Sequence, residues 1–191
     1  VVSNAGKATF KGLELEASAR FGGGFGLAGS LGYIDAQYDE YITNIGNTPT
    51  DVAAFRVVQN TPEVTGSITA SYDTPVGPGD LYLGTTLSYR SKTSQFEIPN
   101  PYLDQGGYAL LDASIVYSAP GDRWSVGVYG KNLLDKEYKT SGYTFVATDP
   151  VTGDIVNGAN GFPVPTLGPE GTLTAFYGNP RQVFATLTFS Y

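Results

Sequence analysis

The sequence contains no cysteine and no histidine. Their absence excludes disulfides, thiolate chemistry and most zinc sites, and it removes the commonest general base of enzymes. Charged residues make up only 15% of the chain, and the acidic ones outnumber the basic ones to give a formal net charge of −7. This charge disfavours a nucleic-acid partner. We therefore expect neither an enzyme nor a protein with a metal or an organic cofactor.

Long apolar runs are also missing. No run reaches the roughly 18 residues of a transmembrane helix, and the N-terminal VVSNAGKATF lacks the basic start and apolar stretch of a signal peptide. If the protein lies outside the cytoplasm, we expect the chain to be a mature piece or a fragment of a longer protein. Glycine (25 residues) and tyrosine (14 residues) are abundant instead.

The final stretch, RQVFATLTFSY at 181–191, alternates between apolar and polar residues, with Phe184 as the one exception. A period of two indicates a β-strand with one apolar and one polar face. About ten residues is also the length that a tilted strand needs to cross a bilayer. An aromatic residue at its end, Tyr191, suits the headgroup layer of a membrane. The apolar face carries Val183, Ala185, Leu187, Phe189 and Tyr191.

The same pattern predicts seven strands, which are separated by alternately short and long connections. Short turns on one side and long loops on the other are typical of a transmembrane β-barrel. We expect a bulge or bend at 131–138, and a small hairpin that pairs 144–147 with 154–157 around the sequence PVTG. The predicted strands are 10–21, 25–38, 62–72, 81–90, 107–117, 124–131 and 181–191, and the predicted long loops are 39–61, 91–106 and 139–179.

Aromatic residues stand at the ends of the apolar faces, where a membrane protein places its interfacial girdles. A soluble antiparallel sandwich also alternates, but it does not explain the asymmetry of the connections. Because seven strands cannot close an antiparallel barrel, we expect an open, curved sheet or a piece of a wider barrel. The girdle residues are Phe21, Phe25, Tyr33, Tyr72, Tyr89, Tyr117, Trp124 and Tyr191.

Four segments, in order along the chain, resemble the β-barrel of TonB-dependent outer-membrane receptors. The run NAGKATFKGLELEASARF at 4–21 carries a KG-x-E-x-E pattern, and TPEVTGSITASY at 61–72 follows it. GYALLDASIVY and WSVGVYGKNLLDKEYKTSGY resemble the segment with an asparagine-leucine-aromatic-aspartate motif, in which Leu134 here replaces the aromatic residue. Asn179-Pro180-Arg181 and the closing strand resemble the family's C-terminal end, although Tyr191 stands where phenylalanine is more usual.

The resemblance implies a bacterial outer-membrane barrel of 22 strands with an N-terminal plug domain inside. Such receptors take up siderophore-bound iron, cobalamin or sometimes carbohydrate, with energy from the TonB complex. We expect this chain, 1–191, to supply the last seven strands, with the plug domain and the TonB-contacting segment absent from it. Outer-membrane lipid, the plug domain, TonB, the barrel-assembly machinery and an iron-siderophore or similar ligand are the implied partners. A passive porin-type barrel, an outer-membrane barrel enzyme and a soluble β-sandwich binding module remain as alternatives.

Three groups of residues are candidates for function. The charged residues on the polar faces are expected to line a wet lumen and contact the plug, and they are Glu14, Glu16, Arg20, Arg90, Asp112 and Lys131. Loops on a rigid scaffold carry recognition, so the aromatic residues of the long loops are expected to bind the ligand, and they are Tyr102, Tyr143, Phe145, Phe176 and Tyr177. The C-terminal pattern resembles a signal for the assembly machinery, and it comprises Leu187, Phe189 and Tyr191.

Overall fold

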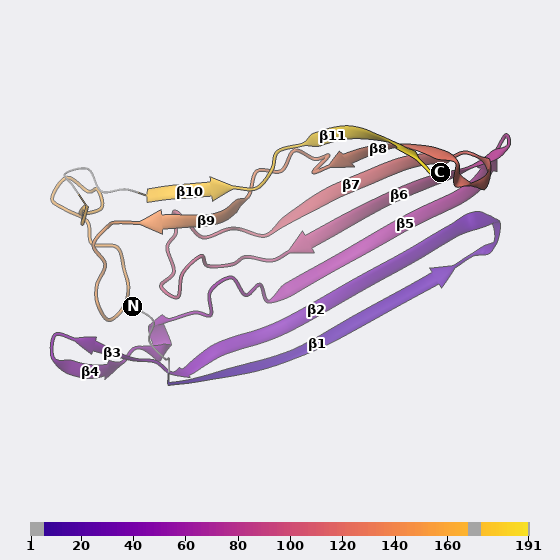
Figure 1. The fold of residues 1–191 in the computed structure, drawn as a ribbon. Helices are drawn as coiled ribbons and strands as arrows, with labels where there is room; N and C mark the ends of the chain where they lie inside the picture. The colour runs from indigo at the N-terminus through magenta and orange to yellow at the C-terminus, as the bar shows by residue number, and fades with distance from the viewer. Residues whose placement is uncertain (1–5, 168–172, 191) are drawn as a thin grey trace.

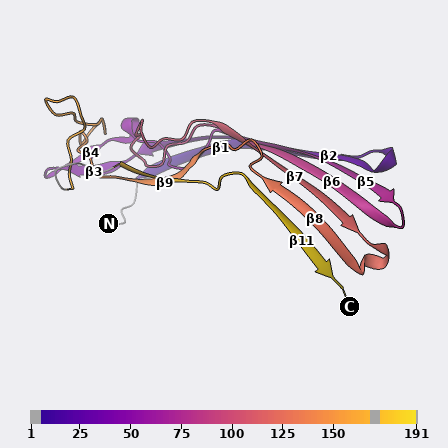
Figure 2. The same cartoon turned by 90° about the horizontal axis from the view of Figure 1, so that it is seen from above.

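The computed structural model describes residues 6–167 and 173–190 and shows one large antiparallel sheet of seven strands, in the order β1-β2-β5-β6-β7-β8-β11. The sheet is open and curves from β2 towards β11 (Figures 1 and 2). All seven predicted strands are present, and the expected all-β, open-sheet architecture is confirmed. The strands are β1 (Lys7–Arg20), β2 (Phe25–Glu40), β5 (Val64–Val76), β6 (Gly79–Arg90), β7 (Tyr108–Ser118), β8 (Trp124–Lys131) and β11 (Gln182–Phe189).

The pairing register keeps the two kinds of face separate across the whole sheet. Ile68 of β5 lies opposite Leu87 of β6, which lies opposite Leu111 of β7. On the other face, Ser67 lies opposite Ser88, and the hydroxyls of Ser30 and Ser67 are 2.8 Å apart. Because side chains alternate along each strand, this register builds one continuous apolar face and one continuous polar face.

The apolar face is exposed, and it is not packed into a dry interior. Ile68 is 55% exposed, Ile115 is 53% exposed and Leu187 is 61% exposed. Within the described residues, the buried apolar side chains are Val52, Leu103, Ala119 and Val146, all outside the strands of the large sheet. A β-sandwich would bury the apolar faces of its two sheets against each other. The exposed apolar face of this sheet is instead of the kind that contacts lipid. No helix in the described part of the chain is long and apolar enough to span a membrane.

The three short turns lie at one end of the sheet and the long loops at the other (Figure 1). The turn between β1 and β2 is a 3-10 turn, Gly22–Gly24, and the turn between β7 and β8 is another, Pro120–Asp122. Gly24 has a φ of 88°, and a Cβ there would collide with the carbonyl oxygen of Asp73. Glycine is therefore required at this position.

The long loops contain regular structure that the sequence pattern does not predict. The hairpin of β3 (Ile42–Ile45) and β4 (Thr48–Asp51) lies within the first long loop, followed by a 3-10 turn at Ala53–Phe55. β9 (Lys139–Thr144) and β10 (Leu173–Tyr177) form a second hairpin within the last loop. The prediction of irregular loops is wrong here because short two-stranded ribbons show too few alternations to be distinguished from loop sequence.

The predicted small hairpin in the last long connection is present only next to its turn. Thr148 pairs with Ile155, and the Val156 N–H donates to the Ala147 carbonyl at 2.9 Å. The predicted pairing of 144–147 with 154–157 is wrong for the rest, because Val146 pairs with Pro165 and Thr144 belongs to β9. The predicted bend after β8 is a tight turn that begins at Asn132, whose φ is 48°.

The turn at Asn132 joins three strands of the sheet. The buried Asn132 side chain accepts a hydrogen bond from the Lys136 N–H at 2.8 Å and donates to the carbonyls of Lys136 and Asn179 at 2.9 and 3.0 Å. The Asn132 N–H donates to the Asp112 carboxylate of β7 at 2.9 Å. Asp135 accepts from the Arg181 N–H at 2.9 Å, just before β11. The asparagine-leucine-x-aspartate motif therefore fixes β7, β8 and the entry to β11 relative to one another.

Candidate functional site

The three long connections contact one another at the end of the sheet opposite the short turns. The Arg56 guanidinium donates to the carbonyls of Val151 and Pro150 at 3.1 and 3.4 Å, and it lies 6.0 Å from the centre of the Tyr41 ring. The Val57 N–H donates to the Glu97 carbonyl at 2.9 Å. Loops that share such bonds order one another, so this end of the sheet is a connected surface that can position recognition side chains.

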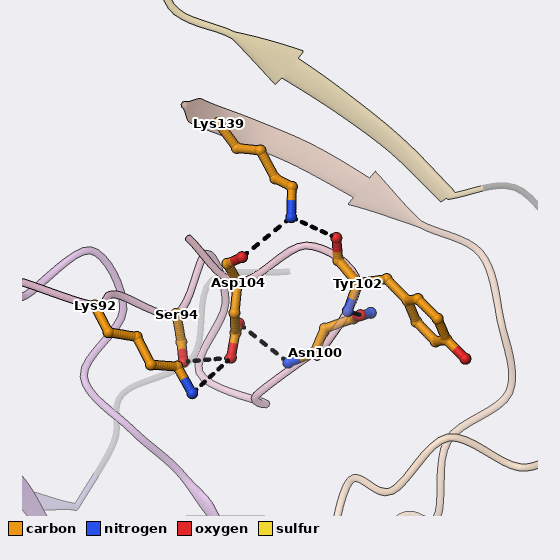
Figure 3. Close-up of polar contacts among 6 residues, drawn as sticks. All are labelled: Lys92, Ser94, Asn100, Tyr102, Asp104 and Lys139. Atoms are coloured by element: carbon orange, nitrogen blue, oxygen red, sulfur yellow. Dashed lines mark hydrogen bonds and ion pairs between the residues drawn. The ribbon is translucent and has the colours of Figure 1, made fainter. Parts of the chain in front are cut away.

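Below this surface, a polar network ties the 91–107 loop to β9 (Figure 3). The Lys139 ammonium donates to the carbonyls of Tyr102 and Asp104 at 2.7 and 3.1 Å. The Asp104 carboxylate accepts from the Ser94 hydroxyl at 3.1 Å and from the Asn100 N–H at 3.2 Å. Lys92 completes the network at 3.8 Å from Asp104. We call these six residues the loop network: Lys92, Ser94, Asn100, Tyr102, Asp104 and Lys139.

The β9–β10 hairpin has one face packed onto this loop and one face open. Gly142 lies against the buried Leu103 side chain, so close that a Cβ added at Gly142 would be 3.2 Å from it. On the open face, the Tyr143 ring lies 5.7 Å from that of Phe176 in an edge-to-face arrangement and 6.5 Å from that of Phe145. We call Tyr143, Phe145 and Phe176 the aromatic cluster. Exposed rings held in fixed contact form a preorganised apolar surface for a ligand.

The structure therefore places the five predicted ligand-contacting aromatics in two groups. Three of them form the aromatic cluster. Tyr102 and Tyr177 are 54% and 52% exposed and take part in no ring pair among the described residues. All five lie on the long-loop side of the sheet, and their role in binding stays a prediction.

The six predicted lumen residues lie on the polar face. Glu14 of β1 and Arg90 of β6 lie in one row of paired residues across the sheet, which runs through Gly32 of β2 and Thr65 of β5. Arg20 lies in a different row. Asp112 and Lys131 line a hollow of about 180 Å³ together with Tyr82 and Tyr129. The six residues form no ion pair with one another or with any other described residue. Contact with a plug stays a prediction, and for Asp112 the structure adds a role in holding the Asn132 turn. Glu16 of β1 pairs with Ser30 of β2.

The predicted assembly residues continue the apolar face at the sheet edge. Leu187 and Phe189 are 61% and 60% exposed on that face, whereas Tyr191 lies outside the described residues. Their role as an assembly signal stays a prediction.

Three loop groups have shifted pKa values, each for a local reason. Hydrogen bonds from the N–H groups of Tyr41 and Ala53 lower the pKa of Asp51. Burial raises the pKa of the Tyr41 hydroxyl, with a smaller contribution from Glu97. Hydrogen bonds from the N–H groups of Thr152 and Val151 lower the pKa of Asp149. Those bonds stabilise the turn at neutral pH, and they are lost as the pH falls through the lowered pKa. Within residues 6–167 and 173–190, no group of three acidic side chains is arranged to hold a metal ion.

Apart from Tyr102, the sequence pattern does not predict the residues of the loop network or the buried polar side chains around it. Gln95 and Gln105 are 7% and 9% exposed, and Asn100 is 4% exposed. Buried polar side chains carry no periodic signal, and they become recognisable only when the partners in distant segments are known. The spacing of prolines and asparagines in the 91–107 loop gives at most a sign of a folded loop.

The chain matches a family model described as "TonB dependent receptor-like, beta-barrel" over residues 1–133. Among curated proteins, it is 29% identical over 194 residues to the ferrichrome outer membrane transporter/phage receptor of Escherichia coli (strain K12), covering 97% of this chain and 20% of that protein. It is 31% identical over 144 residues to the pesticin receptor of Yersinia pestis, covering 74% of this chain and 20% of that protein. The chain thus spans about a fifth of the length of these relatives.

Solved structures share the fold. The ferric yersiniabactin uptake receptor of Yersinia pestis superposes with a TM-score of 0.65 at 23% identity, covering 96% of this chain and 24% of that one. The siderophore receptor PiuA of Acinetobacter baumannii gives a TM-score of 0.63 at 17% identity, covering 96% of this chain and 22% of that one. At these identities the likeness of the two structures concerns the fold alone. All four relatives are described as a transporter or a receptor, and none of them as an enzyme. The alternating seven-stranded sheet and the family match over most of its length together show that the chain belongs to the β-barrel of the TonB-dependent receptor family.

Proposed function

We propose that this chain is part of an outer-membrane active transporter that takes up a ferric siderophore with energy from the TonB complex. The family match and the siderophore receptors among the relatives support this proposal. The single observation that carries it is the separation of surfaces: a lipid-type face over seven strands, a polar face with uncompensated charges, and exposed rings at one end. The whole protein is the transporter, and the chain supplies about a fifth of it.

The rest of the receptor is proposed to complete the barrel. β1 and β11 form the two edges of the sheet, and backbone N–H and C=O groups at an edge need partners inside a bilayer. The remaining strands and a plug domain in the lumen would supply these partners and meet the six charged residues of the polar face. Membrane lipid and the barrel-assembly machinery are further proposed partners.

Uptake of iron in cells tests the proposal. The full-length receptor is produced in a strain that lacks its own siderophore receptors, and uptake of radioactive iron is measured with ferrichrome and with ferric yersiniabactin. We expect energy-dependent uptake of at least one chelate, and we expect its loss in a strain without TonB. Uptake that persists without TonB would indicate a passive porin-type barrel, and no uptake of any ferric siderophore in a broader panel would contradict the proposal.

The aromatic cluster is predicted to contribute directly to ligand affinity. We expect Tyr143→Ala combined with Phe176→Ala to weaken binding of the transported chelate about tenfold, since ring contacts contribute about 0.5–1.5 kcal/mol beyond buried area and about 1.4 kcal/mol is a factor of ten. Binding is measured by fluorescence quenching of the purified receptor.

Phe162→Ala is the matched control for this variant. Phe162 is 70% exposed on the same long connection and takes part in no ring pair among the described residues. Equal loss of affinity in both variants, or loss in neither, would contradict a specific contribution of the aromatic cluster to ligand binding.

A further inference from the structure

A small cavity lies where the polar face of the sheet meets the loops. It has a volume of about 100 Å³ and is lined by the ends of β6 and β7, the 91–107 loop and the start of β9. Roughly three water molecules would fill such a volume in the liquid, so it suits one small polar group and excludes a whole metal chelate. The lining residues are Asn60, Arg90, Thr93, Gln95, Gln105, Tyr108, Lys139 and Thr140.

Two cations line this cavity, and no acidic residue does. Arg90 makes one side-chain hydrogen bond, from Nη2 to the Asn60 carbonyl at 2.9 Å, and its buried Nε atom has no partner among the described residues. Lys139 gives two of its three ammonium protons to the carbonyls of Tyr102 and Asp104. Neither cation forms an ion pair within the described part of the chain. The positive charge at the cavity is therefore uncompensated.

Two neutral side chains in the lining are also without partners. Gln95 and Thr93 are 7% and 5% exposed, and neither side chain makes a hydrogen bond with any residue that the structure describes. Their polar atoms still reach solvent, because Arg90 Nε is the one fully buried side-chain nitrogen or oxygen without a partner in the described part of the chain. The amide of Gln105, by contrast, donates to the Gly106 carbonyl and accepts from the Lys139 N–H. Buried polar groups are normally hydrogen-bonded. The buried Arg90 Nε without a partner, in a lining that also holds Lys139 and no acidic residue, therefore indicates a missing acceptor that carries negative charge.

The carboxylate of Asp104, the one acidic side chain of the loop network, does not compensate these cations. It is held by Lys92, Ser94 and the Asn100 N–H, and only its backbone carbonyl meets Lys139. Glu14 shares the row of Arg90 but is separated from it by β2 and β5, a span of about 14 Å at the usual strand spacing.

We propose that this cavity is a binding site for a single carboxylate group, with Arg90 and Lys139 supplying charge and Gln95 and Thr93 supplying hydrogen bonds. A guanidinium with a free Nε matches the planar geometry of a carboxylate. The carboxylate has two possible sources: a side chain of the receptor's remaining part, or a carboxylate of the imported chelate. The site does not depend on which chelate the receptor transports, so it can fail while the proposed function stands.

Thermal unfolding of the full-length receptor in detergent tests the site, with sodium acetate as the probe against sodium chloride at equal ionic strength. The variants are Arg90→Gln and Gln95→Leu. Lys136→Gln is the control, because it removes one positive charge from an exposed side chain outside the cavity.

If the carboxylate comes from outside the protein, acetate raises the Tm of the unsubstituted receptor, and the half-effective concentration rises at least tenfold in Arg90→Gln and Gln95→Leu but not in Lys136→Gln. If it comes from the receptor itself, acetate has no effect, and both cavity variants lower the Tm more than Lys136→Gln does. The proposal is overturned if acetate has no effect and Gln95→Leu leaves the Tm unchanged or raises it. It is equally overturned if acetate shifts all variants alike.

Discussion

Ile68→Arg is expected to remove most of the folded receptor from the outer membrane. Ile68 lies in the middle of the apolar face of β5, opposite Leu87 of β6 and Gly29 of β2, and it is 55% exposed. An arginine there would place its guanidinium in hydrocarbon, where a barrel loses about 2–4 kcal/mol. Since about 1.4 kcal/mol is a factor of ten, the ratio of folded to unfolded receptor falls by roughly 30-fold or more. The folded fraction is measured from the electrophoretic mobility of outer-membrane extracts that are loaded on the gel without heating.

Ser88→Arg is the matched control for this effect. Ser88 lies next to Leu87 on β6, points to the polar face, and its side chain makes no hydrogen bond with a described residue. We expect near-normal amounts of this variant, because the new charge would be solvated in the lumen. Similar losses for both variants would mean that the two faces are not lipid and water, and the barrel interpretation would then be wrong.

Asn132→Ala is expected to destabilise the receptor by about 3 kcal/mol or more. The substitution removes three side-chain hydrogen bonds at a site that is 5% exposed, and each buried group left without a partner costs about 1–3 kcal/mol. The φ of 48° adds strain, because a left-handed conformation costs alanine about 1–2 kcal/mol. Denaturant unfolding of the purified receptor measures the change.

Two further variants separate the causes at this turn. Asn132→Gly keeps the left-handed conformation without strain but loses the side-chain bonds, so its stability should fall between those of the original receptor and Asn132→Ala. Leu134→Ala changes an adjacent side chain that is 57% exposed, and we expect a change below about 0.5 kcal/mol. If Asn132→Ala proves as stable as Leu134→Ala, the turn does not hold the three strands together.

The strands of the large sheet could be predicted because alternation is a local property. β8 begins at Trp124 and ends at Lys131, as its pattern indicates, and Phe184 faces the polar side, where its ring stacks on Tyr129 at 5.2 Å. The β9–β10 hairpin could not be predicted in the same way. Its strands are six and five residues long and come from segments about 30 residues apart, so neither segment contains the information that fixes its partner.

The candidate sites divide along the same line. The charged residues of the polar face and the exposed aromatics were recognisable from their type and their position in the pattern. The cavity at Arg90 was not, because Lys139 and Gln95 reach it from two connections that are far apart in the sequence. Without their placement, Arg90 is one of several lumen charges, and Lys139 is an ordinary loop lysine.

The amino-acid sequence by itself determined which face of each strand meets lipid, because hydrophobicity at every second position leaves only one orientation of low free energy in a membrane. It also determined the order and the direction of the strands. The arrangement of the segments in space sets which rings touch, which buried guanidinium nitrogen lacks a partner and where positive charge collects. Those properties depend on distances between segments that the backbone brings together through long loops, and no local pattern encodes such distances.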